Sequence, residues 1–293
     1  MKILAFGEIL WDIIEGEEHL GGAPFNFAAH SARCGNDAFI VSRLGMDPLG
    51  RKAFELCVRH GVISELIQWD DEHPTGAVDV TLTNGQPDYF IRENAAYDFI
   101  DTNAAVNGLQ KRSFDLFYFG SLAQRNNVSF ATLHAMLKML DVRWVFYDVN
   151  LRKSCDPVNM VRNSLGACNV FKLNTDEAPV ISNVVCGKSL THEHLCSTLK
   201  ELYPNLEIVV ITAAENGCYV FDGKNFQHIP GVAVKVKDAI GAGDAFSAGF
   251  MHIYSKTGDP LIAGKLANRL GAYVATKRGA VPEYSKEIRE LLT

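Results

Sequence analysis

Short apolar runs alternate along the chain with segments whose apolar residues have helical spacing. The apolar runs predict strands at residues 2–7, 38–45, 114–120, 143–150, 169–174 and 207–213. Segments such as 47–60 and 128–140 repeat apolar residues at the spacing of an amphipathic helix. Strands that alternate with helices are typical of a mostly parallel sheet whose faces are covered by helices. The pattern therefore predicts the α/β class.

A different pattern occupies residues 65–100. Apolar and polar residues alternate there with a period of two around the turn sequence NGQPD at 84–88. This alternation predicts an antiparallel hairpin outside the main sheet. Together with residues 9–20, we expect it to form a small β lid. Because the sequence has no Pro/Gly/Ser-rich linker, low-complexity tract or repeat, we expect one domain over 1–293 with the lid inserted in it.

The composition and charge are those of an ordinary globular protein. With 47% hydrophobic and 21% charged residues, the chain can bury a sizeable core. The 34 acidic and 28 basic residues give a net charge of −6, and no Lys/Arg block resembles the basic stripe of a nucleic-acid-binding protein. A nucleic-acid partner is therefore not expected. A small anion such as a nucleotide remains compatible, because a few N–H groups and one or two cations can hold it.

No segment predicts secretion or a membrane span. The start of the chain is apolar but is interrupted by Glu8 and Asp12, and the longest apolar run, 208–214, is far too short to cross a bilayer. The seven cysteines form no C-x-x-C pair and show no metal-ligand spacing. An odd number of cysteines fits free thiols in a reducing compartment. We therefore expect a soluble cytoplasmic protein with no membrane partner.

The sequence KDAIGAGDAFSAGF at 237–250 carries the clearest chemistry. Gly241, Ala242 and Gly243 precede Asp244, and the small and apolar residues that follow have helical spacing. A helix start without bulky side chains lets a phosphate reach the backbone N–H groups and the positive end of the helix dipole. A carboxylate there fits a base that takes a proton from a hydroxyl attacking the phosphate. The alternative is that Asp244 caps the helix.

Two other nucleotide-binding motifs do not fit. A dinucleotide-binding fingerprint requires G-x-G-x-x-G, but Phe246 stands at the third glycine. The GKS at 187–189 lacks the earlier glycine of a P-loop, because that position is Ser182.

The 237–250 segment resembles the D-T-x-G-A-G-D signature of the ribokinase-like (PfkB) sugar kinases. The resemblance places Asp244 as the catalytic base and the backbone of Gly241, Ala242 and Gly243 as the anion hole. One position departs, because Ala239 replaces the usual threonine. The order of the remaining motifs extends the resemblance over nearly the whole chain. It implies a three-layer α/β/α fold with a central, mainly parallel sheet and a small β lid, and ATP-dependent phosphorylation of a primary sugar hydroxyl.

Three further segments resemble the sugar-binding motifs of that family. GGAPFN at 21–26 provides Gly22 and Asn26, which the resemblance places against sugar hydroxyls, and Asp12 occupies the position of the family's sugar-binding aspartate. DVNLR at 148–152 resembles D-P-N-x-R, with Val149 in place of proline, and Arg152 would hold the substrate or the moving phosphate. Taken alone, the glycines and Asp12 also fit turns, and Arg152 also fits a surface ion pair.

The predicted ATP and Mg²⁺ residues lie in motifs that are less specific. KLNTDEAP resembles N-x-x-E, so Asn174 and Glu177 would hold Mg²⁺ through water and phosphate, although an N-cap followed by a first-turn acid also fits. ITAAENG resembles T-x-G-x-x-G, with Ala214 in place of the first glycine, a change expected to be mild because alanine is small. The resemblance assigns ATP binding to the residues Asn174, Thr212, Gly217 and Asn268, and implies a monovalent cation such as K⁺ near Asp238.

Within the family, GGAPFN is closest to fructokinases, so the expected acceptor is D-fructose. The alternatives are a ribokinase or a 2-keto-3-deoxygluconate kinase, and in the latter Tyr89 and Arg92 would contact the substrate carboxylate. A hypothesis of another class is a non-catalytic sugar-binding regulator, against which Asp244 and both glycines of its loop argue. An exposed lid edge also predicts a homodimer formed through the lid sheets.

Overall fold

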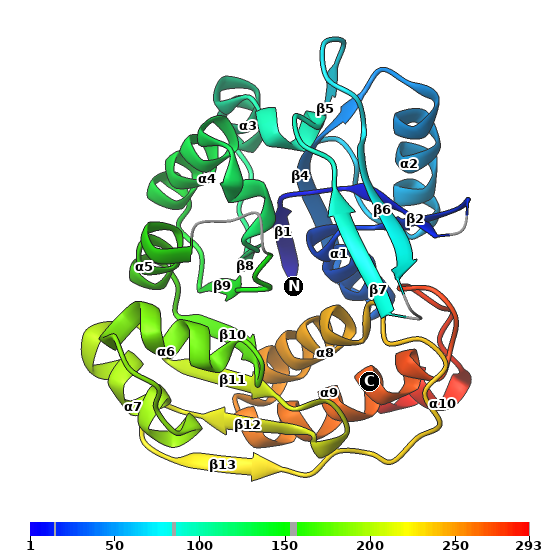
Figure 1. Cartoon of the computed structure of the whole chain (residues 1–293). Coiled ribbons are helices and arrows are strands. Elements are labelled where there is room, and N and C mark those ends of the chain that lie inside the picture. The colour runs from blue at the N-terminus through cyan, green and yellow to red at the C-terminus, as the bar shows by residue number, and fades with distance from the viewer. Residues whose placement is uncertain (15, 84–85, 153–156, 293) are drawn as a thin grey trace.

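The computed structural model describes residues 1–14, 16–83, 86–152 and 157–292, and for 80–83, 86–89 and 157 the backbone alone. Its described residues form a central nine-stranded sheet (Figure 1). The spatial order is β13 (Phe226–Ile229), β12 (Cys218–Phe221), β11 (Ile208–Thr212), β10 (Val170–Asn174), β9 (Trp144–Asp148), β8 (Leu116–Phe119), β1 (Lys2–Phe6), β4 (Asp37–Gly45) and β5 (Ile67–Asp70). From β5 to β11 the strands are parallel, whereas β12 and β13 are antiparallel.

Helices cover both faces of this sheet. One layer contains α1 (Ala23–Arg33), α2 (Pro48–Arg59), α8 (Ala242–Thr257), α9 (Pro260–Ala275) and α10 (Lys286–Leu291). The other contains α3 (Thr102–Leu109), α4 (Asn127–Met139), α5 (Pro157–Ala167), α6 (Ala178–Cys186) and α7 (His192–Leu202). Short 3₁₀ turns are η1 (Ala96–Phe99), η2 (Leu122–Arg125) and η3 (Ala214–Asn216). The expected three-layer α/β/α architecture is confirmed.

The alternation of strand side chains explains why there are two apolar cores. On β1, Ile3 and Ala5 point into the core that contains α1 and α8, whereas Leu4 and Phe6 point into the core that contains α4 and α5. A strand buried on both faces must be apolar throughout, which is the pattern that predicted these strands. All six predicted strands and both predicted helices are present, with bounds that agree within about two residues.

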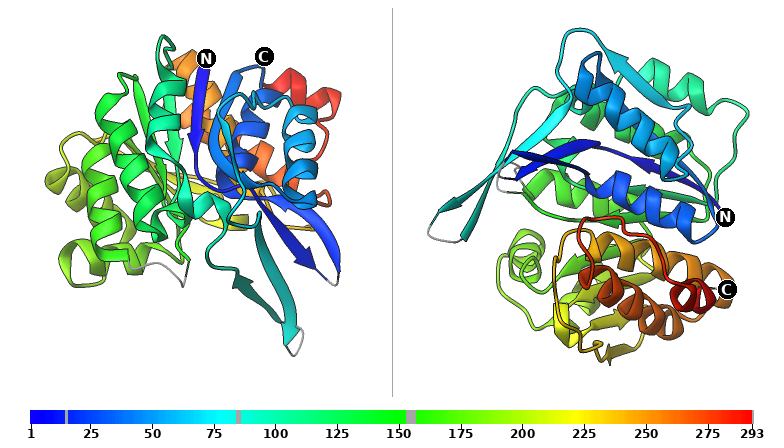
Figure 2. Two further views of the ribbon diagram at one scale, coloured as in Figure 1. Left: turned by 90° about the horizontal axis from the view of Figure 1, so that it is seen from above. Right: turned by 90° about the vertical axis from the view of Figure 1, so that its right-hand side faces the viewer.

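A second, four-stranded sheet extends away from the layered body, as Figure 2 shows. Its order is β3 (Glu17–Gly21), β2 (Leu10–Ile14), β6 (Gly76–Thr83) and β7 (Gln86–Ile91). Strands β2 and β6 are parallel, and the outer pairs are antiparallel. This sheet is called the lid sheet below. The central residues of the predicted turn, 84–85, lie outside the described residues.

The predicted lid range of 65–100 is too wide. Residues Ile67–Asp70 form β5, which pairs in parallel with β4 and is the edge strand of the central sheet. Residues Ala96–Phe99 form η1, whose Ala96, Tyr97 and Asp98 are buried in the body of the protein. The period-two pattern did not separate these segments, because a short edge strand and a lid strand alternate in the same way.

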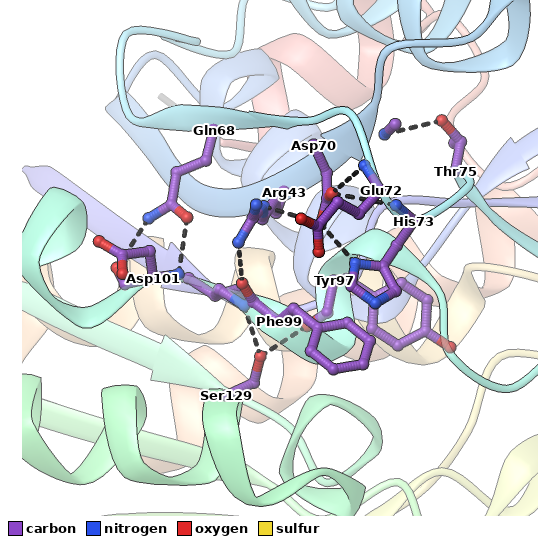
Figure 3. A network of polar contacts seen from close by, with 12 residues as sticks. Arg43, Gln68, Asp70, Glu72, His73, Thr75, Tyr97, Phe99, Asp101 and Ser129 are labelled. Carbon is purple, nitrogen blue, oxygen red and sulfur yellow. Dashed lines mark hydrogen bonds and ion pairs between the residues drawn. The ribbon is translucent and has the colours of Figure 1, made fainter.

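A polar network joins the lid sheet to the body (Figure 3). Arg43 Nε lies 3.0 Å from Asp70 Oδ2, and Arg43 Nη1 donates to the Phe99 carbonyl. His73 Nδ1 lies 3.0 Å from the same Asp70 oxygen, and its ring stacks on Phe99 with 3.7 Å between centroids. These contacts connect β4 and β5 with the segments that enter β6 and leave β7. The root of the lid sheet is therefore fixed.

Six of the seven cysteines lie in the described residues; all six are free thiols, and five are buried. Cys155 lies outside the described residues. Among the helices that the structure describes, none is long and apolar enough to cross a membrane.

Candidate active site

Asp244 lies in the first turn of α8, where the chain enters the helix from an irregular loop. The N-cap residue is Gly241, whose φ of 77° is in the left-handed region. A Cβ at Gly241 would also clash with the backbone of Ala280, so glycine is required there. Among the residues that the structure describes, no side chain makes the N-cap hydrogen bond of α8. The Asp244 carboxylate therefore does not cap the helix, which was the alternative role that its sequence position allowed.

The Asp244 carboxylate is held by an amide from another helix. Asn26, in the first turn of α1, donates from Nδ2 to Asp244 Oδ2 at 2.8 Å. Burial and the nearby Asp148 raise the pKa of Asp244 to about 6, against the opposing effects of Asn26, Lys172 and Arg152. A carboxyl with this pKa is mostly ionised at neutral pH. It is therefore a better proton acceptor than an ordinary aspartate while remaining in its basic form.

Asp244 opens into a cavity of about 810 Å³ between the central sheet and the lid sheet. The cavity lies at the carboxyl ends of β1 and β9, which is where parallel α/β sheets bind their ligands. Seven residues predicted from the sequence line it: Asp12, Gly22, Asn26, Arg152, Gly241, Gly243 and Asp244. The lid sheet contributes Leu10, Val78, Phe90 and Ile91. Segments far apart in the sequence thus meet at one site.

Asp12 and Gly22 occupy the lid side of this cavity. Asp12 lies on β2, and burial raises its pKa to about 6 although Arg152 and His19 oppose the shift. Gly22 is the N-cap of α1 with a φ of 105°, and a Cβ there would clash with the Glu8 carbonyl. Arg152 follows β9 and is exposed, so it is available to an anion in the cavity.

Ala242 differs from its two glycine neighbours. Its N–H donates to the Ala239 carbonyl at 3.3 Å, and it does not line the cavity. Gly243 lines the cavity and lies in the first turn of α8, where an N–H has no carbonyl four residues earlier in the helix. An anion at this helix start would therefore meet Gly241 and Gly243 rather than Ala242.

A buried ion pair lies behind the Asp244 turn and was missed in the sequence. Lys172 Nζ lies 2.9 and 3.0 Å from the two carboxyl oxygens of Asp148. Asp148 Oδ2 also accepts hydrogen bonds from Ser247 Oγ at 2.8 Å and from Tyr118 OH at 3.3 Å. Asp148 begins the DVNLR motif and Lys172 begins KLN, but a charged residue at a strand end is too common to indicate a buried pair. Glu8, which lines the cavity, was also missed.

The predicted magnesium residues bind backbone amides. Asn174 Oδ1 accepts from the N–H groups of Asp176 and Glu177, both at 2.9 Å. Glu177 accepts from Asn174 N at 2.8 Å and from Leu151 N at 2.7 Å. Asn174 Oδ1 already accepts two hydrogen bonds, whereas each Glu177 oxygen keeps a second lone pair, so Glu177 fits an ion held through water better than direct ligation. Within the described residues, no three His, Cys, Asp or Glu side chains are grouped to hold a metal ion.

The other nucleotide-side residues lie away from the cavity. Thr212 ends β11 and is partly exposed. Gly217 has a φ of 89° and packs against the backbone of residues 229–231. Asn268 donates to the carbonyls of residues 229 and 230 at 3.3 and 3.2 Å. Gly217 and Asn268 thus hold the same backbone segment in place.

Two departures from the family motifs have structural consequences. Ala214 has a φ of 46°, a conformation that suits the glycine of the motif, so small size does not make this change mild. Ala239 is exposed beside Asp238, whose oxygens accept from the N–H groups of Ile240 and Gly279 at 3.0 Å. Asp238 thereby ties the Asp244 loop to the 276–280 segment.

Arg92 is engaged within the lid sheet. It donates from Nε and Nη2 to the two oxygens of Asp79 at 2.8 and 2.7 Å and does not line the cavity. The side chain of Tyr89 lies outside the described residues. Arg92, the cation predicted to contact an acidic sugar, is therefore not among the described residues that line the cavity.

Comparison with known proteins gives consistent results over nearly the whole chain. A family model described as "pfkB family carbohydrate kinase" matches residues 3–287. Fructokinase-2 of Solanum lycopersicum is 27% identical over 313 residues, covering 96% of this chain and 92% of that protein.

Two solved structures extend the comparison to three dimensions. An uncharacterized sugar kinase of Pyrococcus horikoshii in complex with ATP has a TM-score of 0.83 at 25% identity and covers 99% of each chain. A fructokinase of Vibrio cholerae in its fructose, ADP and calcium ion bound form has a TM-score of 0.80 at 25% identity, covering 96% of this chain and 94% of that one.

Proposed function

The chain belongs to the pfkB family of carbohydrate kinases, and from this premise we propose that it transfers the γ-phosphoryl group of ATP to a primary hydroxyl of D-fructose. The observation that carries the proposal is the Asn26–Asp244 hydrogen bond at the start of α8, in the cavity between the central and lid sheets. The fructokinase relatives and the ATP complex of a similar kinase support the choice of substrates.

In the proposed reaction Asp244 is the base. Its carboxylate takes the proton of the acceptor hydroxyl while the hydroxyl oxygen forms a bond to the γ-phosphorus. The bond between that phosphorus and the β–γ bridging oxygen breaks, and its electron pair leaves with ADP. The amides of Gly241 and Gly243, with the dipole of α8, would stabilise the charge on the phosphoryl group in transit.

The sugar would lie on the lid side of the cavity, against Asp12, Gly22 and Asn26, with Arg152 near the phosphoryl group. Fructose is preferred to an acidic sugar because Arg92 is already bound by Asp79. A carboxylate substrate would need a second cation in the cavity, because Arg152, which lines it, is assigned to the phosphoryl group. Ribokinase and 2-keto-3-deoxygluconate kinase activities remain the alternatives, and a non-catalytic sugar-binding regulator is the alternative of another class.

On the nucleotide side we propose Asn174, Thr212, Gly217 and Asn268 as ATP contacts. Asn174 and Glu177 would hold Mg²⁺ through water, and the ion would supply charge neutralisation at the phosphates. We also propose a K⁺ ion near Asp238, in the loop that leads to Asp244. The free thiols fit a cytoplasmic location.

The lid sheet would cover the sugar and keep water from the phosphoryl group. We also propose that two copies pair through their lid sheets, because β7 is an edge strand with Phe90 66% exposed. Sedimentation velocity of the native protein and of Phe90→Asp checks this pairing. A native protein that is monomeric at micromolar concentration would contradict it.

The test of the function is a coupled assay of ADP release with ATP, Mg²⁺ and a panel of D-fructose, ribose, 2-keto-3-deoxygluconate and glucose. D-fructose should exceed ribose and the acidic sugar in kcat/KM by about tenfold or more, which corresponds to roughly 1.4 kcal/mol. If the acidic sugar is the best substrate and Arg92→Ala abolishes its use, the alternative kinase is correct. Tight sugar binding without ADP release would favour the regulator.

A further inference from the structure

Glu8 is a buried carboxyl in the cavity with an incomplete set of hydrogen bonds. It lies between β1 and β2, is 4% exposed and lines the cavity. Its Oε1 accepts from Ala23 N at 3.2 Å. Its Oε2 is buried and has no partner among the described residues. Burial raises the pKa of Glu8 to about 7, although its own backbone N–H and Arg152 oppose the shift.

Asn26 leaves a second acceptor free in the same cavity. Its Nδ2 donates to Asp244 Oδ2, which fixes the orientation of the amide, and its Oδ1 is buried with no partner among the described residues. Asn26 is also 4% exposed. Buried polar atoms in folded proteins nearly always have partners, so two free acceptors in one cavity indicate that a ligand provides the donors.

The charges of the cavity indicate which donors fit. Of the described residues that line it, four are acidic (Glu8, Asp12, Glu93 and Asp244) and one, Arg152, is basic. Such a lining disfavours an anionic sugar substrate. It suits the hydroxyl groups of a neutral sugar, which donate hydrogen bonds to oxygen without carrying charge. A carboxyl that titrates near neutral pH can also donate to a hydroxyl when it is protonated.

We propose that Glu8 is a specificity-determining residue whose free carboxyl oxygen binds one hydroxyl of a neutral sugar, beside a second hydroxyl that donates a hydrogen bond to Asn26 Oδ1. The proposal rests on the proposed sugar kinase function and deepens it, because it explains how the cavity distinguishes neutral sugars from sugar acids. These hydroxyls are distinct from the one that Asp244 deprotonates.

The variant Glu8→Gln tests the proposal, because its amide oxygen can still accept from Ala23 N and should preserve the fold. The kcat/KM for D-fructose should fall about tenfold or more while the KM for ATP stays within about twofold, as expected when buried groups lose their match to a substrate hydroxyl. The matched control is Glu55→Gln, which removes an exposed carboxylate of α2 and should leave both parameters unchanged.

Monodeoxy analogues of D-fructose identify the hydroxyl. With the native enzyme, loss of the hydroxyl bound by Glu8 should reduce kcat/KM about tenfold, whereas with Glu8→Gln the same loss should matter less than about threefold. Equal effects in both enzymes at every position would overturn the proposal. So would a Glu8→Gln enzyme that matches the native one, or one in which the sugar and ATP parameters fall together.

Failure of the proposed function can be distinguished from failure of this inference. If the native protein releases no ADP with any sugar, the kinase proposal fails, and Glu8 is then judged from the rise in melting temperature that D-fructose causes. A rise that Glu8→Gln abolishes and Glu55→Gln retains supports the inference. An equal rise in all three proteins overturns it. If Glu8→Gln does not fold, Glu8→Asp, which retains the acid, takes its place in both measurements.

Discussion

Lys172 Nζ lies 2.9 and 3.0 Å from the two carboxyl oxygens of Asp148, and the pair is buried beneath the first turns of α8. Asp148 also accepts from Ser247 Oγ on that helix at 2.8 Å. The pair thus connects β9 and β10 with the helix that presents Asp244. Its positive member also opposes the rise in the pKa of Asp244.

Replacing Lys172 with methionine should therefore be strongly destabilising. The substitution leaves the Asp148 carboxylate buried without its cation, which typically lowers the free energy of unfolding by about 3–5 kcal/mol. Urea unfolding measures the loss. The control Lys286→Met breaks an exposed ion pair with Glu290 and should lower the free energy of unfolding by at most about 1 kcal/mol. Equal losses in the free energy of unfolding of the two variants would show that the buried pair contributes no more to stability than the exposed one.

Asp244→Ala should abolish turnover without unfolding the protein. Asp244 does not cap α8, so its removal costs the helix no capping bond. Loss of a general base typically reduces kcat by about 10² to 10⁴-fold. Steady-state kinetics with ATP and D-fructose give the reduction, and circular dichroism confirms the fold. More than half of the native activity in this variant would exclude Asp244 as the base.

The layers of the fold and seven residues that line the cavity were predicted from the sequence, whereas the buried polar contacts were not. Strands buried on both faces leave continuous apolar runs, and Asp244 and Asn26 lie in glycine-containing motifs, whereas Asp12 was predicted from the family resemblance alone. Lys172 and Asp148 were not found, because their pairing depends on the register of β9 against β10, which brings Lys172 opposite Asp148. β5 was assigned to the lid because pairing partners are not visible in one strand. The conformation of Ala214 could not be predicted from residue size alone.

The raised pKa of Asp244 has a consequence for stability. Its pKa is about 6 in the folded protein against an ordinary value of 3.8, so the folded state binds more protons between these values. This contribution to the free energy of unfolding is complete below pH 3.8 and is lost as the pH rises through 6. Asp244→Asn cannot ionise, so its melting temperature relative to the native protein should be at least about 2 °C higher at pH 8 than at pH 5.

Glu207→Gln provides the control for that measurement. Hydrogen bonds from Arg143 hold the pKa of Glu207 below its usual range, so its stabilisation is present above the unfolded pKa of 4.5 and is lost only at lower pH. This variant should therefore differ from the native protein by nearly the same amount at pH 5 and pH 8. A change with pH as large as that of Asp244→Asn would mean that the effect does not come from burial of Asp244.

The two glycines of the Asp244 loop should respond differently to alanine. Gly241 has a φ of 77°, and a Cβ there would clash with Ala280, so Gly241→Ala should lower the free energy of unfolding by about 1–2 kcal/mol or more. At Gly243 the nearest heavy atom to an added Cβ is Lys172 Nζ at 3.8 Å. Because alanine also favours the helix, Gly243→Ala should melt at or above the native temperature. The reverse order of melting temperatures would contradict the assigned loop geometry.

Asp12→Ala should separate the sugar side of the cavity from the nucleotide side. Asp12 lies on β2 and lines the cavity, whereas the proposed ATP contacts Thr212, Gly217 and Asn268 do not line it. The kcat/KM for D-fructose should therefore fall about tenfold or more, while the KM for ATP remains within about twofold of the native value. The matched control is Asp79→Ala, which removes a lid carboxylate that binds Arg92 outside the cavity. If both variants reduce the kcat/KM for D-fructose equally, the effect arises from the lid sheet as a whole. If the KM for ATP rises together with the KM for D-fructose in Asp12→Ala alone, Asp12 does not lie on the sugar side.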